Sequence, residues 1–255
     1  MLFTKLASAY QKLAGTLTAE LRQALARRDT TLLGVVLNVL PAWPDCCFRP
    51  EAVKHPRSRD TLAFVPAIFG DEELMPKEQA LLDLCLAEKA NNRKVLAYSV
   101  YTGTRDTTSR LKRMLEQAGL KVAVLRASVD TARREDWILD QVDRGIDVLI
   151  TNPELVETGL DLLDFPTIAF LQTGYNVYPL QQAARRSWRI GQKQPVRVIF
   201  FGYAGSSQIT CLQLMAKKIA EAQSTSGDVP DSGLDSLNQD GDSVEMALAR
   251  QLIAA

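Results

Sequence analysis

The chain has 255 residues, of which 46% are hydrophobic, so it is long enough for one large domain or for a core domain with appendages. Its 30 Lys and Arg residues balance its 30 Asp and Glu residues, and the formal net charge of zero excludes nucleic-acid binding driven by a field of the whole molecule. The sequence has no secretory leader and no run of ~18 apolar residues that could span a membrane. We therefore expect a cytoplasmic protein.

Residues 1–75 are expected to form a helical and irregular extension. Over residues 1–28 leucines recur mostly three, four or seven positions apart, which predicts an amphipathic helix with one apolar stripe. A chain that starts inside such a helix is expected to be a piece of a larger protein. Residues 31–40 could continue the helical region, but prolines at 41, 44, 50, 56 and 66 then predict irregular structure.

Two features of this extension leave alternatives open. A basic cluster is favoured as a solvated loop, with a phosphate-contacting loop as the alternative; it consists of Arg49, Lys54, His55, Arg57 and Arg59. A metal site from Cys46, Cys47 and His55 is disfavoured because the spacing matches no common zinc pattern. The four cysteines include no CxxC pair and are expected to be reduced thiols.

Residues 76–222 alternate between helical segments and short apolar runs. Strands are predicted at 94–100, 121–125, 147–151, 167–171 and 196–201. Helices are predicted from Pro76 to about 91, from Thr104 or Asp106 to 119, from Asp130 or Thr131 to 145, from about Pro179, and over 207–222. This alternation predicts an α/β fold of three layers with a central parallel sheet. Ligands of such sheets bind at the carboxyl ends of strands, here after Val100, Thr151 and Leu171.

The last segment differs from the rest in composition. Residues 223–243 are rich in Ser, Gly and Asp, which predicts a flexible acidic linker. Residues 244–253 could form one more short helix. We therefore expect three parts, at 1–75, 76–222 and 223–255.

Two motifs follow the predicted third strand. The first is the loop TNPELVETGLDLLDF at 151–165, and the second is QQAARRSWRIGQ at 181–192. Together they make the chain resemble the second RecA-like lobe of superfamily-two helicases, closest to Swi/Snf-type DNA translocases, over residues 76–222. The resemblance implies a motor of two RecA-like lobes. ATP with Mg would bind between the lobes, and nucleic acid would lie across both. The Arg-Ile-Gly-Gln ending of the second motif favours double-stranded DNA as that nucleic acid.

The resemblance also implies roles for individual residues of the two motifs. The family's Gln-x-x-x-Arg-x-x-Arg falls on Gln182, Arg186 and Arg189, and the two arginines are expected to contact the γ-phosphate of ATP. Arg185 would point elsewhere. Gly159 would let the backbone approach the nucleotide, and Asp161 resembles the acid that accepts a ribose hydroxyl in related helicases.

Four further positions resemble residues that contact nucleic-acid phosphates in the family. They are Thr151, Ser99, Thr102 and Arg134. A simple strand-end cap is an alternative for Thr151. Val100 stands where the family's aromatic-Ser-Gln-aromatic motif has Gln, and Ala127 stands where the loop before Arg134 has Gly.

The sequence contains no phosphate loop of the form GxxxxGK[ST] and no Asp-Glu-x-His motif. We therefore expect that this chain alone neither hydrolyses ATP nor unwinds nucleic acid, and that a first lobe must supply the phosphate loop. The alternative is a stand-alone RecA-like module that binds nucleic acid or a protein. A dinucleotide-binding domain is disfavoured, since no GxGxxG follows any predicted strand.

Overall fold

The structure is a computed structural model of the chain. It describes residues 2–101, 103–156, 160, 162–172, 174, 187, 191–226 and 249. The chain divides into two compact units. One unit is Met75–Gly202, and the other combines Met1–Leu74 with Tyr203–Ala255.

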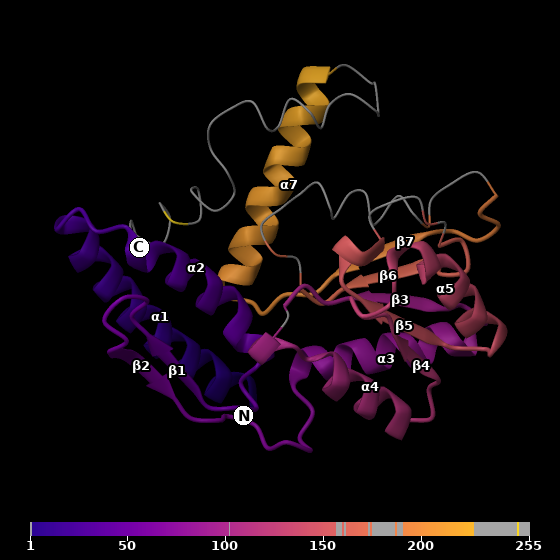
Figure 1. The fold of residues 1–255 in the computed structure, drawn as a ribbon, viewed down its shortest axis with the longest axis horizontal. Helices are drawn as coiled ribbons and strands as arrows, with labels where there is room; N and C mark the ends of the chain where they lie inside the picture. Colours follow the sequence, from indigo (N-terminus) through magenta and orange to yellow (C-terminus); the bar gives the residue numbers. More distant parts are fainter. Residues whose placement is uncertain are drawn as a thin grey trace. The chain divides into compact units, whose positions relative to one another are not determined.

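The unit Met75–Gly202 is built on a five-stranded parallel sheet with the strand order β4-β5-β3-β6-β7 (Figure 1). All five strands were predicted, and they run over Val95–Tyr98 (β3), Val122–Val124 (β4), Val148–Thr151 (β5), Thr167–Phe170 (β6) and Arg197–Phe200 (β7). Every residue of β3, β5 and β6 is buried, as the uniformly apolar runs of a doubly covered sheet require. The predicted α/β class with a central parallel sheet is confirmed.

One helix precedes β3 and two connect strands of the sheet, and local signals in the sequence set their ends. The helices are α3 (Pro76–Ala90), α4 (Thr108–Gln117) and α5 (Arg134–Asp143), with 3-10 turns at Gly103–Arg105 (η2), Thr131–Arg133 (η3) and Pro153–Val156 (η4). Pro76 opens α3, and the Glu78 carboxylate accepts a hydrogen bond from the Met75 N–H at 2.8 Å. Asp106 lies just before α4, and its Oδ1 accepts from the N–H of Thr108, the first residue of the helix, at 2.8 Å.

A buried ion pair ties α3 to α4. Arg110 and Glu78 keep only 5% and 3% of their side-chain surfaces exposed. The guanidinium donates from Nε at 2.7 Å and from Nη2 at 3.1 Å, one bond to each carboxylate oxygen. Such a two-point contact fixes the relative orientation of the helices.

The other unit consists of helices and a hairpin. Its elements are α1 (Leu2–Ala26), α2 (Thr31–Ala42), the 3-10 turn η1 (Trp43–Asp45), β1 (Glu51–Lys54), β2 (Thr61–Val65) and α7 (Ser207–Ser226). The predicted leucine stripe of α1 is confirmed, because the structure buries Leu6, Leu13, Leu17 and Leu21. The Gln208 side chain joins α7 to the end of α2, donating to the Pro41 carbonyl at 2.7 Å and to the Asp45 carboxylate at 3.0 Å.

The structure corrects the expectation of irregular chain over 51–65. These residues form an antiparallel hairpin beside α1 (Figure 1). Its turn is closed by His55, whose Nδ1 accepts from the N–H groups of Arg57 and Ser58, both at 3.2 Å. Arg57 and Arg59 are exposed on this turn. The alternative of a phosphate-contacting loop stays a hypothesis.

The division of the chain into three parts stays a prediction. Helix α7 begins as expected and continues to Ser226, and the structure groups it with the N-terminal residues. The predicted linker beyond Ser226 and the predicted terminal helix lie outside the described residues, apart from Ala249.

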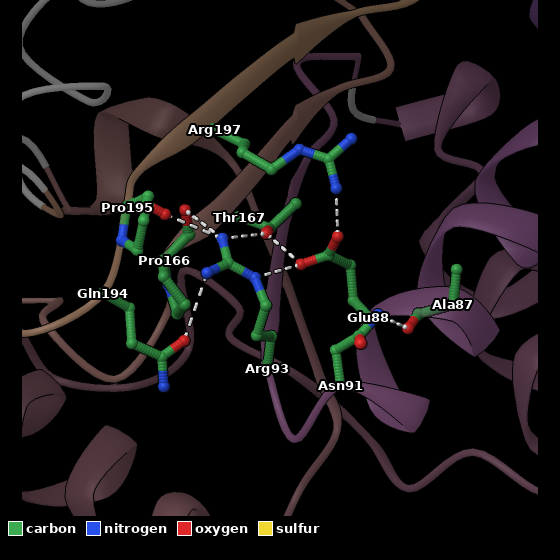
Figure 2. Close-up of polar contacts among 9 residues, drawn as sticks. All are labelled: Ala87, Glu88, Asn91, Arg93, Pro166, Thr167, Gln194, Pro195 and Arg197. Carbon is green, nitrogen blue, oxygen red and sulfur yellow. Dashed lines mark hydrogen bonds and ion pairs between the residues drawn. The ribbon is translucent and has the colours of Figure 1, made fainter.

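An ionic cluster around Glu88 fastens the amino-terminal edge of the sheet (Figure 2). The Glu88 side chain is 2% exposed, and its carboxylate accepts from Arg93 Nε and from Thr167 Oγ1, both at 2.5 Å, and from Arg197. Arg93 also donates through Nη2 to the Pro195 carbonyl at 2.8 Å. One carboxylate therefore joins α3, β6 and β7.

The same contacts change the acidity of Glu88. Burial alone raises the pKa of this carboxyl, but the hydrogen bonds from Thr167 and Arg93, with the charges of Arg93 and Arg197, outweigh it and hold the pKa below its usual value. A lowered pKa means that the fold is stabilised by the ionised form. This stabilisation is present above the ordinary pKa of about 4.3 and is lost as the pH falls through the pKa of the folded state.

We predict that Glu88→Gln lowers the free energy of unfolding by about 3 kcal/mol at pH 7, because it leaves buried arginine contacts without their anion. The difference from wild type should begin to shrink below about pH 4.3, where the carboxyl of the unfolded chain becomes protonated, and should shrink further as the pH falls through the lower pKa of the folded state. Urea denaturation at pH 7 and pH 3.5 measures both values. Glu116→Gln is the control, since the Glu116 side chain is 46% exposed and forms a surface ion pair with Lys112 at 3.6 Å. If the difference in the free energy of unfolding were the same at pH 7 and at low pH, the stabilising role of the ionised Glu88 carboxylate would be contradicted.

Candidate functional site

The carboxyl ends of β3, β5 and β6 lie side by side. In the parallel register Tyr98 pairs with Thr151 on one side and with Phe170 on the other. The loops after these strands therefore begin at one edge of the sheet, which is the edge expected to carry the site.

Gln172, two residues beyond the end of β6, organises this edge. Its Oε1 accepts from Ser99 Oγ at 2.8 Å and from the N–H groups of Val100 and Tyr101, each at 3.1 Å. The residue is 5% exposed. One amide oxygen thus holds the loop after β3. Gln172 was not predicted as a site residue, and its only signal in the sequence is a polar residue directly after an apolar run.

Asn152, which was not predicted as a site residue either, makes a second link between loops. Its Nδ2 donates to the Val100 carbonyl at 3.3 Å, and its Oδ1 accepts from the Glu154 N–H at 3.0 Å. The loops after β3 and β5 are therefore joined through one side chain.

Ser99 and Thr151, the two described residues whose hydroxyl groups are predicted to contact nucleic acid, bond to groups within the protein. A hydroxyl has one hydrogen, and Ser99 donates it to Gln172. Thr151 is fully buried, and its Oγ1 lies 3.3 Å from the Asn152 carbonyl and 3.5 Å from the Leu125 carbonyl. This geometry fits the alternative of a strand-end cap for Thr151. Nucleic-acid contact by Ser99 or Thr151 stays a prediction, and Thr102 lies outside the described residues.

Arg134, at the start of α5, also makes internal contacts. Its Nη1 donates to the Leu155 carbonyl at 3.0 Å, and its Nε donates to the Val129 carbonyl at 3.3 Å. The half-buried guanidinium thus holds the 3-10 turn η4 against the loop after β4. Its predicted contact with nucleic acid is not tested by this arrangement.

Several residues to which the two motifs assign roles lie outside the described part of the chain, namely Gly159, Asp161, Gln182, Arg185, Arg186 and Arg189. Described residues next to them connect the motifs. The fully buried Ser187 donates from Oγ to the Leu162 carbonyl at 3.2 Å. Gln192 donates from Nε2 to the carbonyls of Leu163 at 2.9 Å and Ser187 at 3.0 Å.

Gly191 completes this connection. Its φ of +105° is a conformation that residues with a side chain rarely adopt, and a Cβ here would lie 3.5 Å from Leu163 Cδ1. The Gly in Arg-Ile-Gly-Gln is thus required by the turn that brings Gln192 onto the 162–163 segment.

The described residues show no metal centre. They contain no group of three or more His, Cys, Asp and Glu side chains placed to hold a metal ion. All four cysteines are buried free thiols, and burial, with the nearby Glu88 and Asp147 carboxylates, raises the pKa of Cys85 to about 12. In the part of the chain that the structure describes, no helix is both long and apolar enough to cross a bilayer.

Comparison with known proteins agrees with these motifs. Residues 76–191 match the family described as the helicase conserved C-terminal domain. The chain is similar to the SNF2 domain-containing protein CLASSY 4 of Arabidopsis thaliana, with 24% identity over 204 residues, covering 72% of this chain and 17% of that protein. It is also similar to the bifunctional helicase and thymine dioxygenase JBP2 of Leishmania major, with 26% identity over 126 residues, covering 49% of this chain and 11% of that protein. The chain thus spans less than a fifth of either relative.

A solved structure shares the fold. It is the C-terminal part of the Fun30 ATPase domain, with a TM-score of 0.52 and 19% identity, covering 69% of this chain and 51% of that one.

We predict that Arg134→Lys loosens the turn η4, because a lysine cannot donate to both carbonyls with the fixed geometry of a guanidinium. The expected cost is about 1 kcal/mol of local stability. Faster amide hydrogen exchange over residues 153–156 would show it. Arg133→Lys is the matched control, since Arg133 is the exposed neighbour. Equal exchange in the two variants would contradict the bracing role.

Proposed function

We propose that this chain, whose residues 76–191 are a helicase conserved C-terminal domain with distant similarity to SNF2-type ATPases, is the second motor lobe of an ATP-dependent translocase or helicase acting on double-stranded DNA. In this role it would complete an ATP site whose phosphate loop is supplied by a first RecA-like lobe. It would also hold part of the nucleic-acid track.

The anchoring of the arginine motif onto the 162–163 segment carries the proposal. Ser187 stands in the sequence between Arg186 and Arg189, and its hydroxyl is bonded to the Leu162 carbonyl. Leu162 directly follows Asp161. Arg186, assigned by the resemblance to the γ-phosphate, directly precedes Ser187, and Asp161, assigned to the nucleotide, directly precedes Leu162. The two assigned residues are therefore next in sequence to two residues that are hydrogen-bonded to each other.

The catalytic roles follow from the chemistry of these side chains. Arg186 and Arg189 would stabilise the charge that develops on the γ-phosphate, an effect worth about 10³–10⁵ in rate in nucleotide hydrolases. Gln182 would assist them, and Gly159 and Asp161 would contact the nucleotide. The resemblance implies Mg with ATP, but the described residues offer no metal-binding group, so no part in holding Mg is assigned to them.

The nucleic-acid contacts would be made by the loops at the carboxyl edge. Thr151, Ser99, Thr102 and Arg134 are the proposed residues. Contacts with phosphates position a strand without reading its sequence, as a translocase that moves along any sequence requires.

A stand-alone binding module remains the alternative function. Such a module would need no phosphate loop, and these 255 residues contain none. The two functions differ in whether ATP hydrolysis depends on this chain once a first lobe is present.

We predict that Arg186→Ala and Arg189→Ala each lower the ATPase rate of an enzyme that contains both lobes by about 10³-fold or more, with DNA binding largely retained. Steady-state phosphate release and DNA-binding titrations measure the two effects. Arg144→Ala serves as control, because Arg144 is a 70% exposed arginine paired with Asp140 at the end of α5. Undiminished turnover in both motif variants would remove the assignment.

We also predict that the chain by itself shows no ATP hydrolysis but binds duplex DNA with an affinity that falls as salt rises, because each neutralised phosphate releases counterions. Binding measured between 50 and 200 mM salt, roughly the range over which such contacts weaken, gives the dependence. ATP hydrolysis by the isolated chain would contradict the need for a first lobe. DNA binding without any contribution to hydrolysis beside a first lobe would favour the binding module.

A further inference from the structure

The orientation of the Gln172 side-chain amide is fixed by its neighbours. An amide has an oxygen that accepts hydrogen bonds and an NH₂ group that donates them. The N–H groups of Val100 and Tyr101 can only donate, and both lie 3.1 Å from the same end of the Gln172 side chain. That end must be the oxygen, so the choice between the two amide orientations is settled by chemistry.

The NH₂ group of Gln172 is therefore turned away from the loop that the oxygen holds. Within the described chain, Nε2 makes no hydrogen bond, although the residue is only 5% exposed. Some side-chain nitrogen and oxygen atoms of the described residues are both fully enclosed and unpaired, but Gln172 Nε2 is not one of them. This nitrogen can therefore be reached by a partner from outside the described residues. A donor that reaches solvent can donate to water in the free protein, and an acceptor of a bound ligand can take the place of that water.

The other polar side chains at this edge have committed their donors. Ser99 donates its one hydroxyl hydrogen to Gln172. Thr151 is fully buried and faces backbone carbonyls. Asn152 donates to the Val100 carbonyl. Of these four described side chains, Gln172 is the one whose donor group is unpaired.

We propose that Gln172 Nε2 donates a hydrogen bond to a phosphate oxygen of the nucleic-acid backbone, in the position that the sequence suggested for the Ser99 hydroxyl. The inference rests on the proposed function as far as nucleic acid is the ligand. Nucleic acid is preferred over ATP as the source of the phosphate, because Gln172 holds the loop of Ser99, to which the resemblance assigns a contact with a nucleic-acid phosphate. The nucleotide is expected at the other motifs. A hydrogen bond to an ionised acceptor is stronger than one between neutral groups.

The test is the binding of fluorescently labelled duplex DNA of mixed sequence by the complete chain at one fixed, low salt concentration. Gln172→Glu keeps an acceptor for all three donors but replaces the NH₂ group by a second oxygen. Its Kd should rise about 10- to 100-fold, the range for a lost hydrogen bond to a charged group. Gln172→Met, which has no donor and no charge, should raise the Kd about tenfold.

Two controls separate this contact from other effects. Gln117→Glu introduces the same charge at an exposed position of α4 and should leave the Kd within about twofold of wild type, since a single exposed charge is largely screened. Ser99→Ala is the comparison variant and removes the other candidate donor of this loop: since the Ser99 hydroxyl donates to Gln172, its loss should raise the Kd less than the Gln172 changes do. Thermal unfolding of each variant identifies any that fails to fold, and Gln172→Met then replaces Gln172→Glu as the deciding variant.

Several outcomes would overturn the proposal. If wild type binds DNA and both Gln172 variants bind equally well, the contact does not exist, while the proposed function stands. If Ser99→Ala weakens binding as much as the Gln172 variants do, the donor is Ser99. If the Gln172 variants lose binding of ATP or inorganic phosphate but keep DNA binding, the phosphate belongs to a nucleotide. If wild type shows no DNA binding at low salt, the nucleic-acid part of the proposed function fails, and this inference fails with it.

Discussion

The ionised Glu88 carboxylate is the constraint on which the sheet unit depends. A buried charge is tolerated only when it is paired and hydrogen-bonded, and here Arg93, Thr167 and Arg197 supply the partners. Arg93 extends the same network to the Pro195 carbonyl and to the Gln194 side chain at 3.2 Å. Residues 194 and 195 follow closely on the arginine motif. The cluster therefore fixes the position of the chain between the arginine motif and the start of β7.

The two edges of the sheet use different chemistry. At the amino edge charged groups satisfy one another, whereas at the carboxyl edge the neutral amides of Gln172 and Asn152 hold the loops. A carboxylate at the position of the Gln172 oxygen could accept the same hydrogen bonds, but it would repel any phosphate brought to this edge. A neutral acceptor fastens the loop after β3 without that repulsion. This difference is what a sheet needs if its carboxyl edge is to receive polyanions and its amino edge is to remain closed.

The sequence predicts the sheet well because the strands are continuous apolar runs, and continuous burial is the condition that a central parallel strand must meet. It fails for the hairpin 51–65, where strands of four and five residues flank a polar turn that contains Pro56. It also fails for Glu88 and Gln172. Glu88 is one acid among the polar residues of α3, and Gln172 is one amide after β6. Their importance comes mainly from contacts with residues 71 to 109 positions away, which no local pattern records.

A family motif predicts the residue types at the site, but it does not predict which acceptor each hydrogen-bond donor reaches. Ser99 keeps the hydroxyl of the aromatic-Ser-Gln-aromatic motif, yet a hydroxyl hydrogen serves one acceptor at a time, and here that acceptor is Gln172. Val100 lacks the amide that the motif has at its position, and the structure brings an amide into the same loop from the end of β6. The oxygen of that amide satisfies the loop, and its NH₂ group stays unpaired within the described chain. The loop thus has an amide, which comes from a side chain that lies 72 residues further along the chain than Val100.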